Sequence, residues 1–215
     1  MKKLSGLVIA ALLLSGCGTA VKETSGGTTN SGSGNHVSAS EVGAVDPEGL
    51  QVYMPEQGLV KNFEVDTFEV VREVKQVEEN KALEIITFGD VKTVQISEWT
   101  ESTMDMLLET SELTGVKDLS LEGLVPMESP VSMINEANQA EGEWQITGTS
   151  ETLETPAGTF EDVLVITQTL KSDTSDQVTA ISNYYAPSLG LIQEQTTVTN
   201  GDNVHESKME LVSYE

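Results

Sequence analysis

The sequence predicts a mainly β domain arranged as an antiparallel meander, and two features of its C-terminal half carry this prediction. Apolar and polar residues alternate along short segments, as they do in a strand with one buried face. Turn signals containing Gly, Pro and Asn separate these segments, which favours consecutive strands over alternating strand and helix units. Five strands are therefore expected, at residues 143–147, 160–170, 178–185, 191–199 and 204–214.

The connections in this half have recognisable turn chemistry. Thr155-Pro156-Ala157-Gly158 fits a type I turn with Pro at its second and Gly at its fourth position. Asn200-Gly201-Asp202-Asn203 fits a tight hairpin, and Pro187 and Gly190 mark a corner. Alternation along the second strand predicts one shared apolar face for Phe160, Leu164, Ile166 and Leu170.

The N-terminal half of the domain is less regular. Closely spaced Val and Phe residues predict one long strand over 63–77, and the segments 83–88 and 91–99 flank Gly89-Asp90 as a tight hairpin. Between Thr103 and Gly142 the pattern fades, apart from a short apolar run that fits either a helix or a strand. This stretch is expected to be a long connection or cover, and a connection of this length is a candidate functional element.

The chain begins as a secretory signal does. Met1-Lys2-Lys3 is basic, and the apolar run over 4–14 is too short to span a bilayer, which takes about 20 helical residues. The next residues resemble the lipobox of bacterial lipoproteins, which consists here of Leu14, Ser15, Gly16 and Cys17. Residues 1–16 are therefore expected to be removed, leaving Cys17 with a thioether-linked diacylglycerol and fatty-acyl chains such as palmitate.

Three regions follow from this start: the signal peptide 1–16, the lipidated cysteine with a linker over 17–44, and a single β-rich domain over 45–215. The linker is rich in Gly, Ser and Thr, so it is expected to be a flexible coil with a reach of about 25–30 Å. With one cysteine in the chain, the domain depends on its hydrophobic core rather than on an internal disulfide. We expect it to be anchored at the outer, extracytoplasmic face of the cell membrane.

The composition is strongly acidic, with 35 Asp and Glu residues against 11 Lys and Arg residues. Lys2 and Lys3 leave with the signal, so the remaining chain carries nine basic residues and a net charge of −26. Such a charge repels phosphate polymers, and we expect no nucleic-acid partner. It favours solubility and is compatible with cations or basic partners, although a solvated acidic surface is the simplest interpretation.

Two motifs of the domain resemble those of a known group of proteins. Thr155–Phe160 reads Thr-Pro-Ala-Gly-Thr-Phe and Tyr184–Ile192 reads Tyr-Tyr-Ala-Pro-Ser-Leu-Gly-Leu-Ile, in the order found in uncharacterised lipoproteins of Gram-positive bacteria. Tyr53–Gly58 approximates an upstream aromatic-x-Pro element of that group, and Pro126–Trp144 is a longer version of its Pro-to-Trp stretch. Where the group has a tryptophan after the upstream glycine, this chain has Phe63.

The resemblance implies an antiparallel sheet that curves around a helix or loop, similar to the half-barrel of periplasmic lipoprotein carriers. It implies no known activity and supplies no catalytic residue. Both motifs correspond physically to a turn and a strand corner, so roles in backbone geometry are favoured over ligand contact. The residues with this expected structural role are Pro156, Gly158, Phe160, Tyr184, Tyr185 and Gly190.

The sequence contains no evident catalytic constellation. Its histidines are His36 in the linker and His205 on the last expected strand, where Ser207 shares a face with His205 but has no acid or nucleophile turn beside it. Two distant histidines and a lipidated cysteine cannot form the usual zinc site, and acidic turn residues such as Asp173 lack EF-hand spacing. We therefore expect no enzyme activity, no metal site and no cofactor.

Two functions remain open at this point. The first is a non-enzymatic binding module whose concave apolar face takes a lipid, a peptide or another envelope ligand, and an empty cavity lined by Trp144, Leu164 and Ile166 would favour it. The second is a structural or surface-interaction protein whose acidic exterior meets cations or basic partners. A concavity filled by Met104–Leu108 and Val131–Ile134 would favour the second function.

Overall fold

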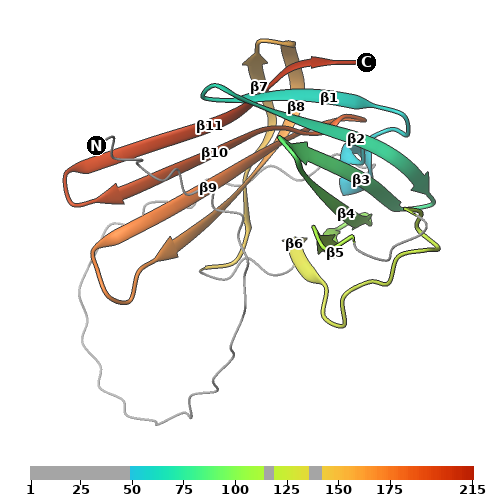
Figure 1. Ribbon diagram of the computed structural model, residues 1–215. Coiled ribbons are helices and arrows are strands. Elements are labelled where there is room, and N and C mark those ends of the chain that lie inside the picture. The colour runs from blue at the N-terminus through green and yellow to red at the C-terminus, as the bar shows by residue number, and fades with distance from the viewer. Residues whose placement is uncertain (1–48, 114–118, 136–141) are drawn as a thin grey trace, which may run out of the picture. The chain divides into compact units, whose positions relative to one another are not determined.

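A computed structural model describes residues 49–113, 119–135 and 142–215. The predicted signal peptide and the whole of the linker, including Cys17, lie outside these ranges. One turn of 3-10 helix and eleven strands occur within them (Figure 1). In chain order these elements are η1 (Leu50–Tyr53), β1 (Val60–Val65), β2 (Phe68–Glu78), β3 (Lys81–Phe88), β4 (Val91–Trp99), β5 (Thr103–Thr110), β6 (Val131–Asn135), β7 (Gln145–Thr155), β8 (Gly158–Lys171), β9 (Gln177–Ala186), β10 (Gly190–Asn200) and β11 (Asn203–Tyr214).

The strands of the described residues form one antiparallel sheet in the order β6-β5-β4-β3-β2-β1-β11-β10-β9-β8-β7. Strands that neighbour each other in the chain pair throughout, except that β6 and β7 do not, and β1 pairs with β11 to join the two halves. Figure 1 shows β9, β10 and β11 as long ribbons on one side and β1 to β5 on the other. The sheet curls until it is nearly closed like a barrel, and its edge strands β6 and β7 approach each other.

This architecture confirms the predicted mainly β, antiparallel and curved fold with a loop cover. All five strands expected in the C-terminal half are present as β7 to β11, although β7 continues eight residues past the predicted end, to Thr155. The hairpin between β10 and β11 turns at Gly201, whose backbone is left-handed with a φ of 57°. The hairpin between β3 and β4 also turns where the Gly89-Asp90 pair predicted it.

Two predictions for the N-terminal half were wrong. The single long strand over 63–77 is in fact the end of β1 and most of β2, which pair as a hairpin. Asp66 makes this possible because its φ of 54° is left-handed, a conformation that Asp tolerates better than most residues. The stretch from Thr103 to Gly142 is only partly a cover, because it supplies β5 and β6 to the sheet.

The predicted shared face of the second C-terminal strand was also wrong for Phe160. Leu164 and Ile166 pack in one buried cluster with Trp99, whereas Phe160 packs in another with Val163. The register between β7 and β8 shifts at this point, and Asp162 has a φ of 53°. This β-bulge inserts an extra residue, which moves Phe160 out of the alternation followed by Leu164 and Ile166.

The sheet wraps around the short helical turn η1. Leu50 and Tyr53 of η1 are 0% and 4% exposed and pack with Trp99, Leu164 and Ile166. The amide of Leu50 is held by the carbonyl oxygen of Glu101 at 2.9 Å. A helical turn therefore occupies the inside of the curl, as the family resemblance implied.

A separate loop covers another buried cluster, which lies on β3, β4 and β5. Leu124 is 7% exposed and packs with Leu83 and Ile96. The loop is fixed to strands on both sides, since Leu121 N donates to Gln76 Oε1 at 3.0 Å and Met127 N donates to the carbonyl oxygen of Leu107 at 2.8 Å. This loop is the part of the predicted cover that is present in the structure.

Candidate functional site

Two of the segments that carry the family resemblance, the Tyr184–Ile192 motif and the upstream Tyr53–Gly58 element, meet at one corner of the domain. Gly190, at the start of β10, has a φ of 69°, and a Cβ atom built on it would lie 3.3 Å from the ring of Pro55. Backbone hydrogen bonds tie the same segments together: Glu56 N donates to Ser188 O at 2.9 Å, and Ser188 N donates to Val52 O at 2.8 Å. Segments more than 130 residues apart in the chain are thereby joined, and glycine at position 190 favours both the left-handed backbone and the close approach to Pro55.

The Thr155–Phe160 motif forms the tip of the β7–β8 hairpin. Pro156 and Ala157 make the two-residue turn, and Gly158 follows with a φ of 142°. Ala157 N donates to the carbonyl oxygen of Leu211 at 3.2 Å, so the tip is fastened to β11. Phe160, 9% exposed, anchors the same hairpin in the core. These positions set backbone geometry and packing.

The corner also surrounds a cluster of buried charges that the sequence analysis did not identify. Lys61 of β1 is 0% exposed, and its Nζ atom donates to the carbonyl oxygen of Leu189 at 2.7 Å and lies 3.3 Å from Glu84 Oε1. The other carboxylate oxygen of Glu84 accepts from Arg72 Nη2 at 2.8 Å. Arg72 Nη2 also donates to Gln95 Oε1 at 2.9 Å, so strands β1 to β4 each contribute one residue.

Burial and attraction act differently on the two charges of this cluster. Burial outweighs the attraction of Glu84 and, together with the repulsion from Arg72, lowers the pKa of Lys61 to about 8. Burial by itself would raise the pKa of Glu84, but the positive charges of Arg72 and Lys61 and their hydrogen bonds lower it to about 2. One carboxylate is therefore shared by two cations at neutral pH.

The sequence did contain a signal for this cluster. Arg72 alternates with Val70 and Val74 on one face of β2, and Lys61 alternates with Phe63 on β1. A charged residue in register with buried apolar neighbours predicts a buried charge, which must find a partner. The partner itself could not be read from the sequence, because it depends on how β1, β2 and β3 pair.

The residues expected to line an apolar cavity are packed instead. Leu164 and Ile166 are each 0% exposed, which leaves no room for even a water molecule against their surfaces. Trp144 is 8% exposed in the same cluster, together with Met104 of β5 and Ile134 of β6. Met104 and Ile134 belong to the segments Met104–Leu108 and Val131–Ile134, which were considered as fillers of the concavity. Both residues occupy it.

The two tyrosines of the second motif point to different surroundings. Tyr185 is buried, packs edge-on against Trp99 with ring centroids 5.7 Å apart, and has its pKa raised to about 12 by burial. Tyr184 is half-buried and lines a shallow hollow with Val165. Adjacent residues on a strand face opposite sides, so the ring of Tyr185 packs in the cluster of Trp99, whereas Tyr184 packs against the cluster of Phe63 and Phe160 and borders this hollow.

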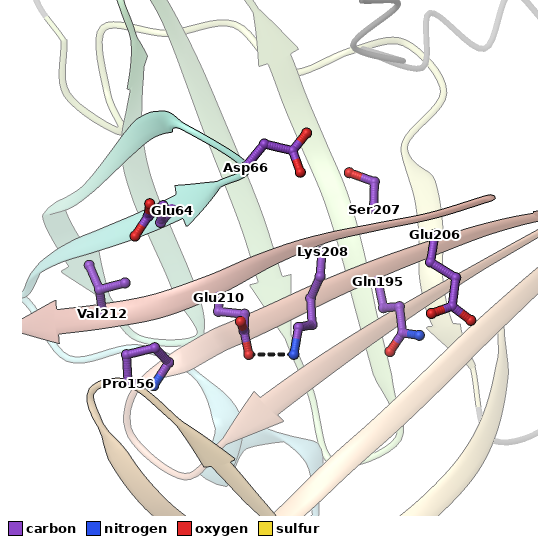
Figure 2. Close-up of a pocket in the computed structure, with 9 residues that line it drawn as sticks. All are labelled: Glu64, Asp66, Pro156, Gln195, Glu206, Ser207, Lys208, Glu210 and Val212. Carbon is purple, nitrogen blue, oxygen red and sulfur yellow. Dashed lines mark ion pairs between the residues drawn. The ribbon is translucent and has the colours of Figure 1, made fainter.

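The larger surface hollow lies over β1, β10 and β11 and is acidic. Its volume is about 430 Å³, and Figure 2 shows four carboxylate side chains around it. The one lysine of the lining, Lys208, is paired with Glu210 at 2.6 Å, so it offers no free positive charge there. The lining residues are Glu64, Asp66, Pro156, Gln195, Glu206, Ser207, Lys208, Glu210 and Val212.

The residues considered for catalysis or metal binding are not assembled into a site. His205 is exposed on β11, and Ser207 lines the acidic hollow without it. Across residues 49–113, 119–135 and 142–215, no three His, Cys, Asp or Glu side chains are grouped as metal ligands. The same residues include no helix long and apolar enough to cross a membrane.

Comparisons with known proteins find fold-level likeness alone. No protein-family model and no curated protein sequence matches the chain. A crystal structure at 2.70 Å of a candidate lipoprotein from Parabacteroides distasonis ATCC 8503 has 14% identity and a TM-score of 0.47, covering 76% of this chain and 98% of that chain. A candidate exported protein with a YmcC-like fold from Bacteroides fragilis NCTC 9343 has 14% identity and a TM-score of 0.46, covering 75% and 97% of the two chains.

Proposed function

We propose that this chain is a lipid-anchored, extracytoplasmic interaction protein that acts through the outside of its sheet. The signal-like start and the Leu14-Ser15-Gly16-Cys17 lipobox support the anchor. The packing of Leu164 and Ile166, both 0% exposed, supports an exterior rather than an interior binding surface. Of the two functions that the sequence leaves open, this packing favours the surface-interaction protein over the carrier of an apolar ligand.

If the protein instead carried an apolar ligand in its interior, native mass spectrometry would detect the bound ligand. The chain from Gly18 onward, which lacks the signal and the lipid, is offered a membrane extract and then purified. Because the interior is occupied by η1 and by Met104 and Ile134, we expect the mass of the protein alone. A lipid or peptide bound in stoichiometric amount would refute the proposal that the protein acts through the outside of its sheet, and would favour a carrier of an apolar ligand.

The acidic hollow over β1, β10 and β11 is the surface that we propose for a basic protein partner. Four carboxylates surround it, and Lys208 is already neutralised by Glu210. Electrostatic complementarity of this kind increases association rates and selects partners of opposite charge. The net charge of −26 adds a long-range attraction for such a partner and repels nucleic acids.

The effect of the charge at this hollow on association can be distinguished from the effect of the net charge of the chain. Association of a lysine-rich peptide is measured by surface plasmon resonance at several salt concentrations, for the wild type and for Glu64→Gln combined with Glu206→Gln. A control with the same charge change combines Glu154→Gln and Glu161→Gln, two exposed positions on β7 and β8 that do not line the hollow. We expect a clearly larger loss of association rate for the first pair. Equal losses would show that the peptide responds to net charge alone.

A further inference from the structure

A second surface hollow, formed by β7, β8 and β9, has a shape that depends on irregularities in β7. Its volume is about 270 Å³, and its lining residues are Thr147, Gly148, Glu151, Thr152, Leu153, Val165 and Tyr184. The register between β7 and β8 shifts three times between Ile146 and Leu153, and Ser150 has a left-handed φ of 56°. Bulges of this kind re-aim side chains and are common beside binding sites.

The bulges place Glu151 over Gly148. A Cβ atom built on Gly148 would lie 3.0 Å from Glu151 Cγ, 3.2 Å from Glu151 Oε1 and 3.3 Å from a methyl group of Val165. A methyl group at position 148 would crowd the side chain of Glu151 in this position, and glycine leaves it room. Gly148 and the bulge thus direct one carboxylate into a hollow that also has an apolar wall.

The hollow combines an aromatic ring, apolar side chains and polar groups. Tyr184 contributes a half-buried aromatic ring, and Val165 and Leu153 contribute apolar contacts beside it. Glu151 contributes a single carboxylate, and Thr147 and Thr152 contribute exposed hydroxyl groups. An aromatic ring suits the C–H face of a sugar, and a carboxylate accepts strong, charge-assisted hydrogen bonds from hydroxyl groups.

A row of hydroxyl groups continues from the hollow across the sheet. The hydroxyl oxygens of Thr147 and Thr167 are 3.0 Å apart, and those of Thr167 and Ser182 are 2.9 Å apart. The row therefore crosses β7, β8 and β9, whose spacing is about 4.8 Å from strand to strand. Each hydroxyl can both donate and accept, so the row offers repeated hydrogen-bond partners to an elongated polyhydroxylated chain.

We infer that this hollow and the adjoining hydroxyl row bind a neutral glycan. The net charge of −26 and the carboxylate of Glu151 disfavour acidic polysaccharides, while the polar rim disfavours a purely apolar ligand. A neutral glycan satisfies the aromatic ring, the carboxylate and the hydroxyl groups at once. This site is separate from the acidic hollow proposed for a basic partner and does not depend on that proposal.

The binding test uses the full chain in mild detergent and saturation-transfer-difference NMR. The probes are four neutral oligosaccharides, namely chitotetraose, cellotetraose, maltotetraose and mannotetraose, with a hyaluronate tetrasaccharide as an acidic comparison. We expect saturation transfer to at least one neutral probe and none to hyaluronate. Absence of transfer to all four neutral probes at millimolar concentration would overturn the inference, as would equal binding of hyaluronate.

Variants then place the bound probe on this hollow. Glu151→Gln, at an exposed position, is expected to weaken binding about tenfold, which corresponds to the loss of a charge-assisted hydrogen bond. Thr147→Val is expected to weaken binding severalfold, and the matched control Glu154→Gln, on the same strand but outside the lining, is expected to leave it unchanged. Unchanged affinity in Glu151→Gln, or an equal loss in Glu154→Gln, would overturn the assignment of the site. Thermal melts of each variant establish that the fold is retained.

Discussion

Replacing Glu84 with Gln tests whether the buried charge cluster stabilises the fold. Among the described residues, Glu84 is the carboxylate that contacts both Lys61 Nζ and Arg72 Nη2, at 3.3 and 2.8 Å, and its replacement removes the anion that these two buried basic side chains share. The pKa of Glu84 falls from 4.5 to about 2 on folding. A shift of this size corresponds to about 3 kcal/mol of stability, and removal of one partner from a buried ion pair costs about 3–5 kcal/mol in other proteins.

The pH dependence follows from the direction of the shift. A carboxyl group whose pKa is lower in the folded state stabilises the fold fully above its unfolded value, here 4.5, and loses that contribution as the pH falls towards 2. Other carboxylates also respond to acid, so the informative quantity is the difference between the wild type and Glu84→Gln. That difference is expected to be about 3 kcal/mol at pH 7 and to shrink steadily below pH 4.5.

Urea unfolding of the chain from Gly18 onward, followed by far-ultraviolet circular dichroism from pH 7 down to pH 2.5, measures this difference. Glu69→Gln is the matched control, since Glu69 lies on β2 at an exposed position. We expect the control to change the free energy of unfolding by less than about 0.5 kcal/mol. A loss below about 1 kcal/mol for Glu84→Gln at pH 7, or a difference from wild type that does not change with pH, would refute the reasoning.

Two further predictions concern the corner and the loop cover. Gly190→Ala places a methyl group 3.3 Å from Pro55 at a position with a left-handed backbone, so the free energy of unfolding should fall by about 2 kcal/mol. Gly201 is the control: its backbone is also left-handed, but a Cβ atom there would have nothing within 4 Å, so Gly201→Ala should cost about 1 kcal/mol. Equal losses in urea unfolding would show that the contact with Pro55 is unimportant. Leu124→Ala should cost about 2–3 kcal/mol, because Leu124 is 7% exposed over the β3–β5 cluster, whereas Val125→Ala, at an 83% exposed neighbour, should cost almost nothing. Similar thermal melts for these two variants would mean that the loop does not stabilise the sheet.

The fold was predictable where the alternation of apolar and polar residues is regular. The second half of β8 and the later part of β9 follow that rule, and tight turns at Gly89 and Gly201 have glycine where the backbone is left-handed. The rule failed where a residue other than glycine takes that conformation. Asp66, directly after β1, has a φ of 54°, and Asp162, with a φ of 53°, lies at the bulge that displaces Phe160. Asp tolerates this conformation but adopts it far less regularly than Gly, so neither position marks a turn in the sequence.

Strand β5 was harder to predict for a related reason. Leu107 and Leu108 are both buried, although neighbours on a regular strand face opposite sides. The register with β4 shifts between Ile96 and Ser97, and this irregularity lies opposite the pair of leucines. Two faces of β5 are also covered, one by the interior cluster and one by the loop that carries Leu124. A strand buried on both faces loses its alternation and resembles a short buried helix.

The candidate sites were less predictable than the fold because each depends on contacts between distant strands. Lys61 and Arg72 could be recognised as charges in apolar register, but their shared partner Glu84 follows from the pairing of β1, β2 and β3. The hollow at Glu151 depends on bulges in β7 that place this residue over Gly148. Sequence alternation gives the face of a side chain, whereas bulges decide which side chains from neighbouring strands meet.

The buried cluster also gives a physical reason for the two distant motifs to occur together. The Nζ atom of Lys61 donates to the carbonyl oxygens of Leu189 and Leu191, at 2.7 and 3.4 Å, and these carbonyls flank Gly190 in the downstream motif. Pro55 of the upstream motif packs against the same glycine. A shift of the backbone at Leu189 and Leu191 would leave a buried ammonium group with fewer acceptors, which is costly in the interior. Pro55, Gly190 and the carbonyl groups of Leu189 and Leu191 therefore form one packed corner beside the buried ammonium group of Lys61.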